Sequence, residues 1–150
     1  MLKPGDAAPS VTLSDQHGTT VSLAGYRGRK VLVFFYPKAS TPGCTQQACL
    51  LRDLADQFGD TAIMGISPDT SSSQLKFDQK NSLGFALLAD TDHAVAEAFE
   101  VWKKKSMHGR EYMGIERSAF LIDETGTISH AWYKISPKET PLRLLEALVR

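Results

Sequence analysis

Two cysteines are the residues of this 150-residue sequence best suited to covalent chemistry, and they lie five positions apart as Cys44 and Cys49. The segment Thr41-Pro42-Gly43-Cys44 follows a strongly apolar run, and Thr followed by Pro is a typical start of a helix. Cys44 is therefore predicted to lie in the first helical turn, where backbone N–H groups have no intrahelical acceptor and the helix dipole is positive. Both effects favour the thiolate, which is the nucleophilic form of cysteine.

A second interpretation of Cys44 is purely structural. Apolar residues at spacings of three and four form one stripe of the predicted helix; they are Cys44, Ala48, Leu51, Ala55 and Phe58. A free cysteine is often a small buried core residue, and an unperturbed one is only about 3% thiolate at pH 7. From its spacing alone, Cys44 is either a reactive thiol or a core residue.

The five-residue spacing sets a condition on any disulfide between the two cysteines. Within one helix their Cα atoms are about 8.6 Å apart, beyond the roughly 7 Å limit for a disulfide. The first turns of the helix must therefore unwind before Cys49 can react with Cys44. The spacing also differs from the Cys-x-x-Cys pattern of dithiol oxidoreductases. Cys49 by itself is either a partner of Cys44 or an inert helix residue.

Composition argues against several other functions. The 17 Lys and Arg residues balance 17 Asp and Glu residues, so electrostatic binding of nucleic acid or of an anionic membrane is not expected. No apolar run approaches the roughly 20 residues that span a bilayer, and the first residues lack the apolar core of a signal peptide. We therefore expect a cytoplasmic protein. The four histidines are scattered and no Gly-rich phosphate loop is present, so no metal or cofactor is expected.

Predicted strands and helices alternate around the cysteines. Strands are predicted at 31–36, 62–66, 85–89, 119–122 and 128–133, with a hairpin at 11–23. Helices are predicted at 44–58, 71–81 and 92–99, and from an N-cap at Thr140 to Arg150. This order predicts an α/β, thioredoxin-like fold in one domain over residues 1–150, with a central mixed sheet flanked by helices and an N-terminal β-hairpin extension. Lys103-Lys104-Lys105 is predicted to lie in a solvated loop, and Trp102 and Tyr112 to pack in the core.

The pattern Pro37-x-x-x-Thr41-x-x-Cys44 resembles the active-site motif of the peroxiredoxins. The neighbouring residues through Gln47-Ala48-Cys49 resemble the Q-type subgroup of that family. Further segments that resemble it run along almost the whole chain; they are Gly5-Asp6-x-Ala8-Pro9, Gly65-Ile66-Ser67-x-Asp69, Leu87-Leu88-Ala89-Asp90, Gly114-Ile115-x-Arg117 and Phe120-Leu121-Ile122-Asp123.

The resemblance implies a role for each matching residue. Cys44 corresponds to the peroxidatic cysteine, which attacks a peroxide oxygen and becomes a sulfenic acid. Thr41 corresponds to the residue whose hydroxyl contacts both sulfur and peroxide, and Pro37 to the residue that packs over the site and limits water access. Arg117 corresponds to the arginine that stabilises the thiolate and orients the peroxide. Cys49 corresponds to the resolving cysteine that part of the subgroup carries in this helix.

The function implied by the resemblance is a thiol-dependent peroxidase without a prosthetic group. Its substrates would be hydrogen peroxide and organic hydroperoxides, its reductant thioredoxin, and its assembly state a monomer. A thiol–disulfide oxidoreductase and a peroxide-sensing redox module stay open as alternatives. The chain departs from the usual pattern at Gln47, where Glu is common, and at Leu50, where Gly is common. Leu50 predicts a helix that is harder to unwind beside Cys49, because glycine is a weak point in a helix.

Overall fold

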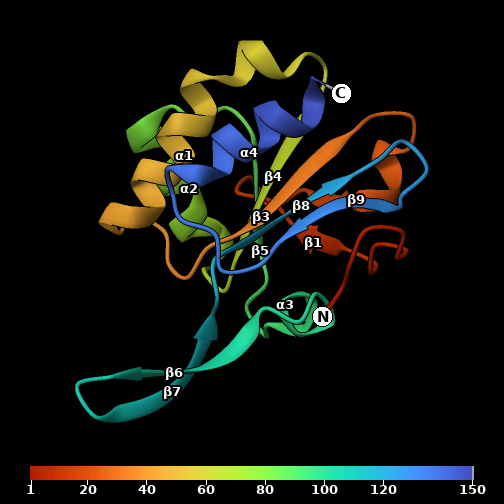
Figure 1. Ribbon diagram of the computed structural model, residues 1–150. Coiled ribbons are helices and arrows are strands. Elements are labelled where there is room, and N and C mark those ends of the chain that lie inside the picture. Colours follow the sequence, from red (N-terminus) through yellow and green to blue (C-terminus); the bar gives the residue numbers. More distant parts are fainter. Residues whose placement is uncertain (150) are drawn as a thin grey trace.

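A seven-stranded mixed sheet forms the centre of the computed structural model, which describes residues 1–149 (Figure 1). Its strands are β1 (Thr12–Ser14), β2 (Thr20–Ser22), β3 (Val31–Phe35), β4 (Ala62–Ser67), β5 (Ala86–Ala89), β8 (Ser118–Ile122) and β9 (Ile128–Trp132). They lie in the order β2-β1-β5-β4-β3-β8-β9. Strands β3, β4 and β5 are parallel neighbours, whereas β8 pairs antiparallel with both β3 and β9. The predicted strands and the N-terminal hairpin of β1 and β2 are confirmed.

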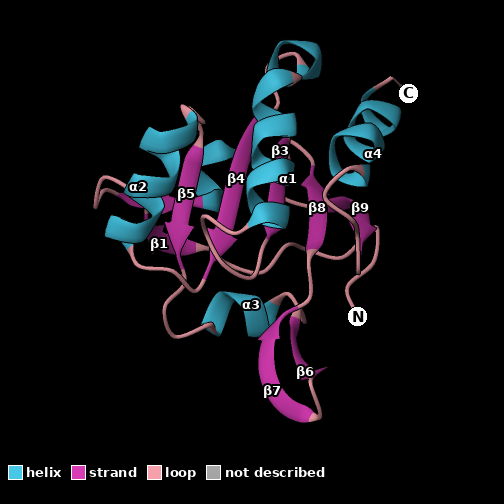
Figure 2. Ribbon diagram, turned by 90° about the vertical axis from the view of Figure 1, so that its left-hand side faces the viewer, coloured by secondary structure: helices cyan, strands magenta, loops and turns pink. Residues whose placement is uncertain are grey.

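Helices cover both faces of this sheet. The elements are α1 (Pro42–Asp53), α2 (Ser71–Asn81), α3 (Ala94–Ala98) and α4 (Glu139–Leu148), with short 3-10 helices at Leu23–Tyr26 and Ala55–Phe58. Helices α1, α2 and α4 contribute to one core cluster, and α3 contributes to the cluster on the opposite face (Figure 2). No helix within residues 1–149 is long and apolar enough to cross a membrane.

Strand β3 lies in the middle of the sheet and is buried along its whole length. Its side chains alternate between the two core clusters, with Leu32 and Phe34 under α1, α2 and α4, and with Val33 and Phe35 on the α3 side. A strand that is covered on both faces consists of a continuous run of apolar residues, which explains why β3 could be predicted from the sequence. Because β3 leads directly into the loop before α1, a rigid strand holds the segment that carries Cys44.

The largest departure from the predictions is a second, two-stranded sheet. It consists of β6 (Trp102–Met107) and β7 (Arg110–Ile115), which form a hairpin that projects away from the body (Figure 1, teal). Placing Lys103-Lys104-Lys105 in a loop was therefore wrong, because these residues lie within β6. The hairpin turn is made by His108 and Gly109, whose φ angles are 52° and 78°. Two positive φ angles are typical of the tightest hairpin turns, and this short turn lets a polar ribbon form.

The two aromatic residues of this hairpin do not pack alike. Trp102 is half-buried and stacks on His93 with ring centroids 4.0 Å apart. Tyr112 is 42% exposed, so the prediction that it packs in the core was wrong. The ribbon projects from the sheet, and its outer residues therefore have no core to enter.

The starts of two helices differ from the predictions: α3 begins later and α4 begins earlier. Helix α3 begins at Ala94 rather than at residue 92, because the buried Asp90 carboxylate accepts hydrogen bonds from the Val95 and Ala96 amides. Helix α4 begins at Glu139, so Thr140 is not its N-cap as predicted. Instead, Thr140 is buried in the first turn and donates to the Ser136 carbonyl at 2.9 Å. The predicted end of this helix at Arg150 lies outside the described residues.

Candidate active site

Cys44 lies in the first turn of α1, as the sequence predicted. The helix begins at Pro42, and Thr41 occupies the N-cap position with an extended backbone. The first intrahelical bond runs from the Thr45 amide to the Thr41 carbonyl at 2.8 Å. The side chain of Cys44 is only 2% exposed. The sulfur therefore lies at the positive end of a helix in a site largely shielded from water, where an anion is stabilised by the helix dipole.

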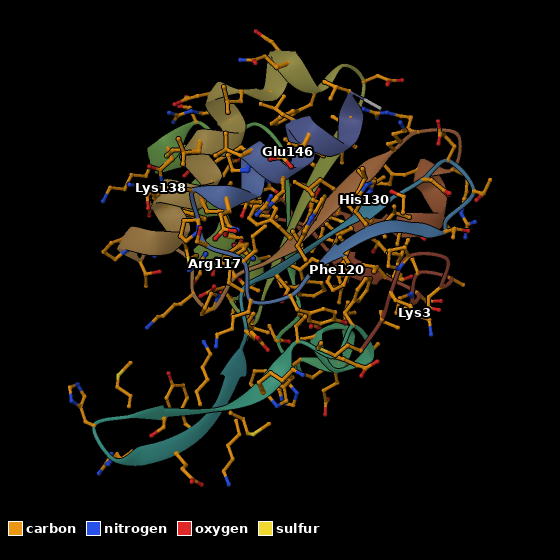
Figure 3. The ribbon with its side chains drawn as sticks, viewed as in Figure 1. Lys3, Arg117, Phe120, His130, Lys138 and Glu146 are labelled. Carbon is orange, nitrogen blue, oxygen red and sulfur yellow. The ribbon has the colours of Figure 1, made fainter. Side chains whose placement is uncertain are left out.

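The Arg117 guanidinium is in contact with this sulfur. Its Nη2 donates to Cys44 Sγ at 3.4 Å, and its Nη1 donates to Gln47 Oε1 at 2.7 Å. Arg117 lies where the chain returns from the β6–β7 hairpin and enters β8, 73 positions from Cys44 (Figure 3). A Cβ on Gly43 would lie 3.3 Å from Arg117 Nη2, so the missing side chain lets the guanidinium pass close to the start of α1.

A buried chain of hydrogen bonds fixes the position of Arg117. Gln47 is fully buried, and its Nε2 donates to Thr140 Oγ1 at 2.8 Å. Thr140 in turn donates to the Ser136 carbonyl at 2.9 Å. Because the Thr140 hydroxyl donates to Ser136, its oxygen must accept from the Gln47 amide nitrogen. The Gln47 carbonyl oxygen therefore faces Arg117 and accepts from it. Two N–H donors of Arg117 thus bind a neutral amide and the sulfur, one each.

We expect that Gln47→Glu lowers the reactivity of Cys44. A carboxylate at this position would compete with the thiolate for the Arg117 guanidinium and would repel the negative sulfur. The thiolate should therefore form at higher pH, and the rate constant for hydrogen peroxide at neutral pH should fall about tenfold. The measurement is the pH dependence of Cys44 alkylation together with the rate of peroxide consumption.

The matched control for this substitution is Gln46→Glu. Gln46 is the exposed neighbour of Gln47 on the same helix, so it adds the same charge where solvent screens it. Equal effects of the two substitutions, or none from Gln47→Glu, would contradict a specific role for the neutral amide.

The loop between β3 and α1 is held by a carboxylate from the end of β4. Asp69 Oδ2 accepts from the Ala39 amide at 2.7 Å and from the Ser67 hydroxyl at 2.6 Å. Within the loop, the Thr41 hydroxyl donates to the Lys38 carbonyl at 2.8 Å rather than capping α1. The Thr41 hydroxyl proton is thus used within the loop, which leaves the lone pairs of its oxygen free to accept a hydrogen bond.

Tyr36 anchors the start of the same loop. Its hydroxyl donates to Gln74 Oε1 at 2.5 Å, and Gln74 Nε2 donates to Ser67 Oγ at 2.9 Å. Complete burial raises the pKa of Tyr36 far above its usual range, so this phenol stays a neutral donor. It therefore supports the loop and is not an acid of the site. Pro37 follows Tyr36 directly and is half-buried.

Cys49 lies in α1 as predicted, but its sulfur contacts helix α2 and not Cys44. Its side chain is half-buried, and its Sγ donates to Asn81 Oδ1 of α2 at 3.7 Å. Arg52 Nη1 also binds Asn81, at the carbonyl oxygen, at 2.5 Å. Both cysteines are free thiols and lie within one continuous helix. The structure thus brings Cys44 together with Arg117 and keeps Cys49 apart from them.

Sequence reasoning missed two residues that organise this site. Gln47 was noted only as a departure from a family pattern, although it is the hydrogen-bond partner of Arg117. Asp69 was not singled out for a role, although it follows β4 at the end where β3 also finishes. Polar residues at the carboxyl ends of adjacent parallel strands lie close together, and this signal could have placed Asp69 beside the loop.

Comparisons with known proteins agree with this geometry. The model of the AhpC/TSA family matches residues 4–131. Peroxiredoxin Bcp of Bacillus subtilis is 46% identical over 149 residues, which is 98% of this chain and 95% of that protein. Peroxiredoxin Bcp of Escherichia coli K12 is 49% identical over 133 residues, covering 87% and 85% of the two chains. Among solved structures, a cysteine-to-serine variant of Xylella fastidiosa PrxQ has a TM-score of 0.92 at 30% identity, covering 99% and 96%.

A structure of the Xanthomonas campestris bacterioferritin comigratory protein, which has alkyl peroxide reduction activity, has a TM-score of 0.87 at 35% identity. It covers 93% of this chain and 90% of that one. These matches and the site show that the chain belongs to the AhpC/TSA family of thioredoxin-like proteins. Within it the chain is a peroxiredoxin similar to the Q-type proteins, and its activity is that of a thiol-dependent peroxidase.

Proposed function

We propose that Cys44 is the peroxidatic cysteine and that Arg117 stabilises its thiolate and orients the peroxide. The observation that carries this assignment is the 3.4 Å contact between Arg117 Nη2 and the buried Cys44 sulfur in the first turn of α1. The guanidinium thus contacts a sulfur that lies in the first turn of a helix, where the helix dipole is positive. Fixed donors of this kind stabilise charge where it develops in a transition state.

The first chemical step is attack of the thiolate on a peroxide oxygen. An S–O bond forms and the O–O bond breaks, so that sulfur is oxidised to a sulfenic acid by two electrons. The departing oxygen takes the electron pair and a proton from solvent, and leaves as water or an alcohol. Negative charge thus moves from sulfur to the departing oxygen. Arg117 can stabilise the charge at both positions because its guanidinium carries several donors in one plane.

Thr41 and Pro37 shape the space around the sulfur in this proposal. The Thr41 oxygen, held by its bond to the Lys38 carbonyl, accepts a hydrogen bond from the bound peroxide. Pro37 limits access of water from its half-buried place after β3. Both roles follow the match to the family motif, and the ordered loop held by Asp69 supports them.

The second step is condensation of the sulfenic acid with the Cys49 thiol. This step forms the Cys44–Cys49 disulfide and releases water. It requires local unwinding of α1, because an intact helix holds the Cα atoms about 8.6 Å apart. A dithiol then reduces the disulfide by exchange, and we propose thioredoxin as that reductant. Leu50 beside Cys49 makes the unwinding slower than a glycine would.

The proposed substrates are hydrogen peroxide and organic hydroperoxides. The alkyl peroxide reduction activity of the Xanthomonas campestris relative supports the second class. A single domain over residues 1–150, a monomeric state and a cytoplasmic location are further parts of this proposal.

Peroxide consumption and insulin reduction, measured side by side with thioredoxin as the electron source, test the function. We expect peroxide to be consumed over many turnovers, and insulin to be reduced no faster than by thioredoxin alone. Insulin reduction clearly faster than by thioredoxin alone would favour a thiol–disulfide oxidoreductase. A single oxidation of Cys44 that thioredoxin does not reverse would favour a peroxide-sensing module.

A further inference from the structure

We propose that Asn81, the last residue of α2, is a positioning residue for the second step of the reaction. Together with Arg52 it holds Cys49 against α2 and thereby sets how fast Cys49 reaches Cys44. The inference rests on the proposed role of Cys49 as the resolving cysteine and adds two residues to it. The group formed by Cys49, Arg52 and Asn81 is called the Asn81 contact below.

Cys49 and Arg52 of α1 bind the same residue of α2. They are three residues apart, and residues at this spacing share one face of a helix. Helices α1 and α2 cover the same face of the sheet (Figure 2). The Cys49 sulfur donates to Asn81 Oδ1 at 3.7 Å, and Arg52 Nη1 donates to the Asn81 backbone carbonyl at 2.5 Å. Asn81 therefore ties the second half of α1 to the end of α2.

Arg52 suits its place in this contact because α2 ends there. The Asn81 carbonyl is one of the last four of α2, which have no intrahelical donor, and the helix dipole is negative at this end. An arginine binds such a carbonyl favourably. Asp53 orients the guanidinium, since its Oδ1 accepts from Arg52 Nε at 2.9 Å and lies 2.8 Å from Nη2. Nη1 is thereby directed to Asn81.

The side chain of Asn81 is oriented to accept from a thiol. Its Nδ2 donates to the Phe77 carbonyl at 3.0 Å, so its Oδ1 faces the Cys49 sulfur. In the second step an S–S bond forms and the S–O bond of the sulfenic acid breaks, and the Cys49 proton leaves with the hydroxyl group as water. A disulfide sulfur has no proton to donate. The hydrogen bond from Cys49 to Asn81 must therefore be lost on the way to the product.

The Asn81 contact thus stabilises the closed helix and not the disulfide. A contact that exists only in the closed state lowers the population of the open state by its own free energy. Its removal should let α1 open more often, so that condensation becomes faster. Cys44 and Arg117 take no part in the contact, because their own bond lies in the first turn of α1. The first oxidation of Cys44 should therefore keep its rate.

The test compares Arg52→Met and Asn81→Ala with the control Lys80→Met. Lys80 is exposed in the last turn of α2, so its replacement removes a positive charge beside the same helix end and leaves the bonds to Asn81 in place. Timed acid quench followed by mass spectrometry measures loss of the reduced protein and formation of the disulfide separately within one turnover.

In Arg52→Met and Asn81→Ala, we expect the disulfide to form about threefold to tenfold faster than in the wild type, with the first oxidation unchanged within about twofold. This split distinguishes positioning of Cys49 from general damage to α1, which would slow the first oxidation as well. Lys80→Met should leave both rates within about twofold of the wild type, because an exposed charge contributes little.

The same two variants should resist overoxidation. Sulfinic acid forms when a second peroxide reacts before condensation, so the peroxide concentration that inactivates half of the protein in a fixed number of turnovers should rise by the same factor. Arg52→Lys keeps a cationic donor for the Asn81 carbonyl, although without the planar fork that also binds Asp53. It should return both the condensation rate and this concentration toward the wild-type values.

Three results would overturn the proposal. One is a condensation rate that is unchanged in both Arg52→Met and Asn81→Ala. Another is slower condensation, which would mean that the contact orients Cys49 for attack. The third is an equal acceleration in Lys80→Met, which would assign the effect to the charge at the end of α2. The role of Cys49 is tested separately, since a wild-type protein that forms no Cys44–Cys49 disulfide would exclude that role and this inference together.

Discussion

Replacing Arg117 by alanine is expected to lower the second-order rate constant for hydrogen peroxide by about 10²–10³-fold. Removal of one donor that stabilises charge in a transition state commonly has an effect of this size. Here the lost group contacts the Cys44 sulfur at 3.4 Å, and its charge opposes the negative charge on both the thiolate and the departing oxygen. Stopped-flow measurement of thiol oxidation by peroxide, with each protein fully reduced, gives the rate constant directly.

Two further substitutions sharpen this test. Arg143→Ala removes an arginine from the exposed face of α4, where it pairs with Glu139 and Glu146, and it should leave the rate unchanged. Arg117→Lys keeps the charge, but an amine cannot reproduce the planar fork that reaches Cys44 and Gln47 together, so an intermediate rate is expected. Near wild-type turnover in Arg117→Ala would refute the proposed role.

Cys49→Ser is expected to stop recycling by thioredoxin while the first oxidation of Cys44 keeps its wild-type rate. Without a resolving thiol the sulfenic acid persists and reacts with a second peroxide to give sulfinic acid. Multiple-turnover activity with thioredoxin should fall by about two orders of magnitude or more, because sulfinic acid is not reduced by a dithiol. Mass spectrometry of the peroxide-treated proteins distinguishes the products.

In the wild type, the expected product is a Cys44–Cys49 disulfide, two hydrogens lighter than the reduced protein. In Cys49→Ser, the expected product is Cys44 that has gained two oxygens. Asn81→Ala provides a control, because it removes the side-chain partner of Cys49 and leaves both thiols in place. A wild-type protein that retains Cys44 sulfenic acid, or a Cys49→Ser protein with full thioredoxin-dependent turnover, would exclude Cys49 as the resolving residue.

The segment from β3 to α1 could be predicted from the sequence because its signals are local. The apolar run at 31–36 indicates a strand covered on both faces, and Thr41-Pro42 marks the helix start that the structure confirms. The contact between Arg117 and Cys44 could not be derived from spacing, since 73 positions separate them. It was anticipated only through the resemblance to a family motif, and the structure places the two side chains together.

The β6–β7 hairpin was missed for a physical reason. Its strands project from the body, so their residues need not alternate between apolar and polar types as half-buried strands do. The pattern therefore gave no strand signal at Lys103-Lys104-Lys105. The prediction that Thr140 is an N-cap was wrong although the local signal was present, because Thr followed by Pro is a good N-cap pattern. The Thr140 hydroxyl is used instead in the buried chain of hydrogen bonds that ends on Arg117.

Helix α1 continues without interruption past Leu50, and this affects how long the protein stays active at high peroxide concentration. In the proposed mechanism, the Cys44 sulfenic acid either condenses with Cys49 after α1 opens or reacts with a second peroxide molecule. The rate of helix opening does not depend on the oxidant concentration, whereas the rate of the second oxidation rises with it. The more slowly the helix opens, the lower is the peroxide concentration at which a given fraction of the molecules is inactivated in each catalytic cycle.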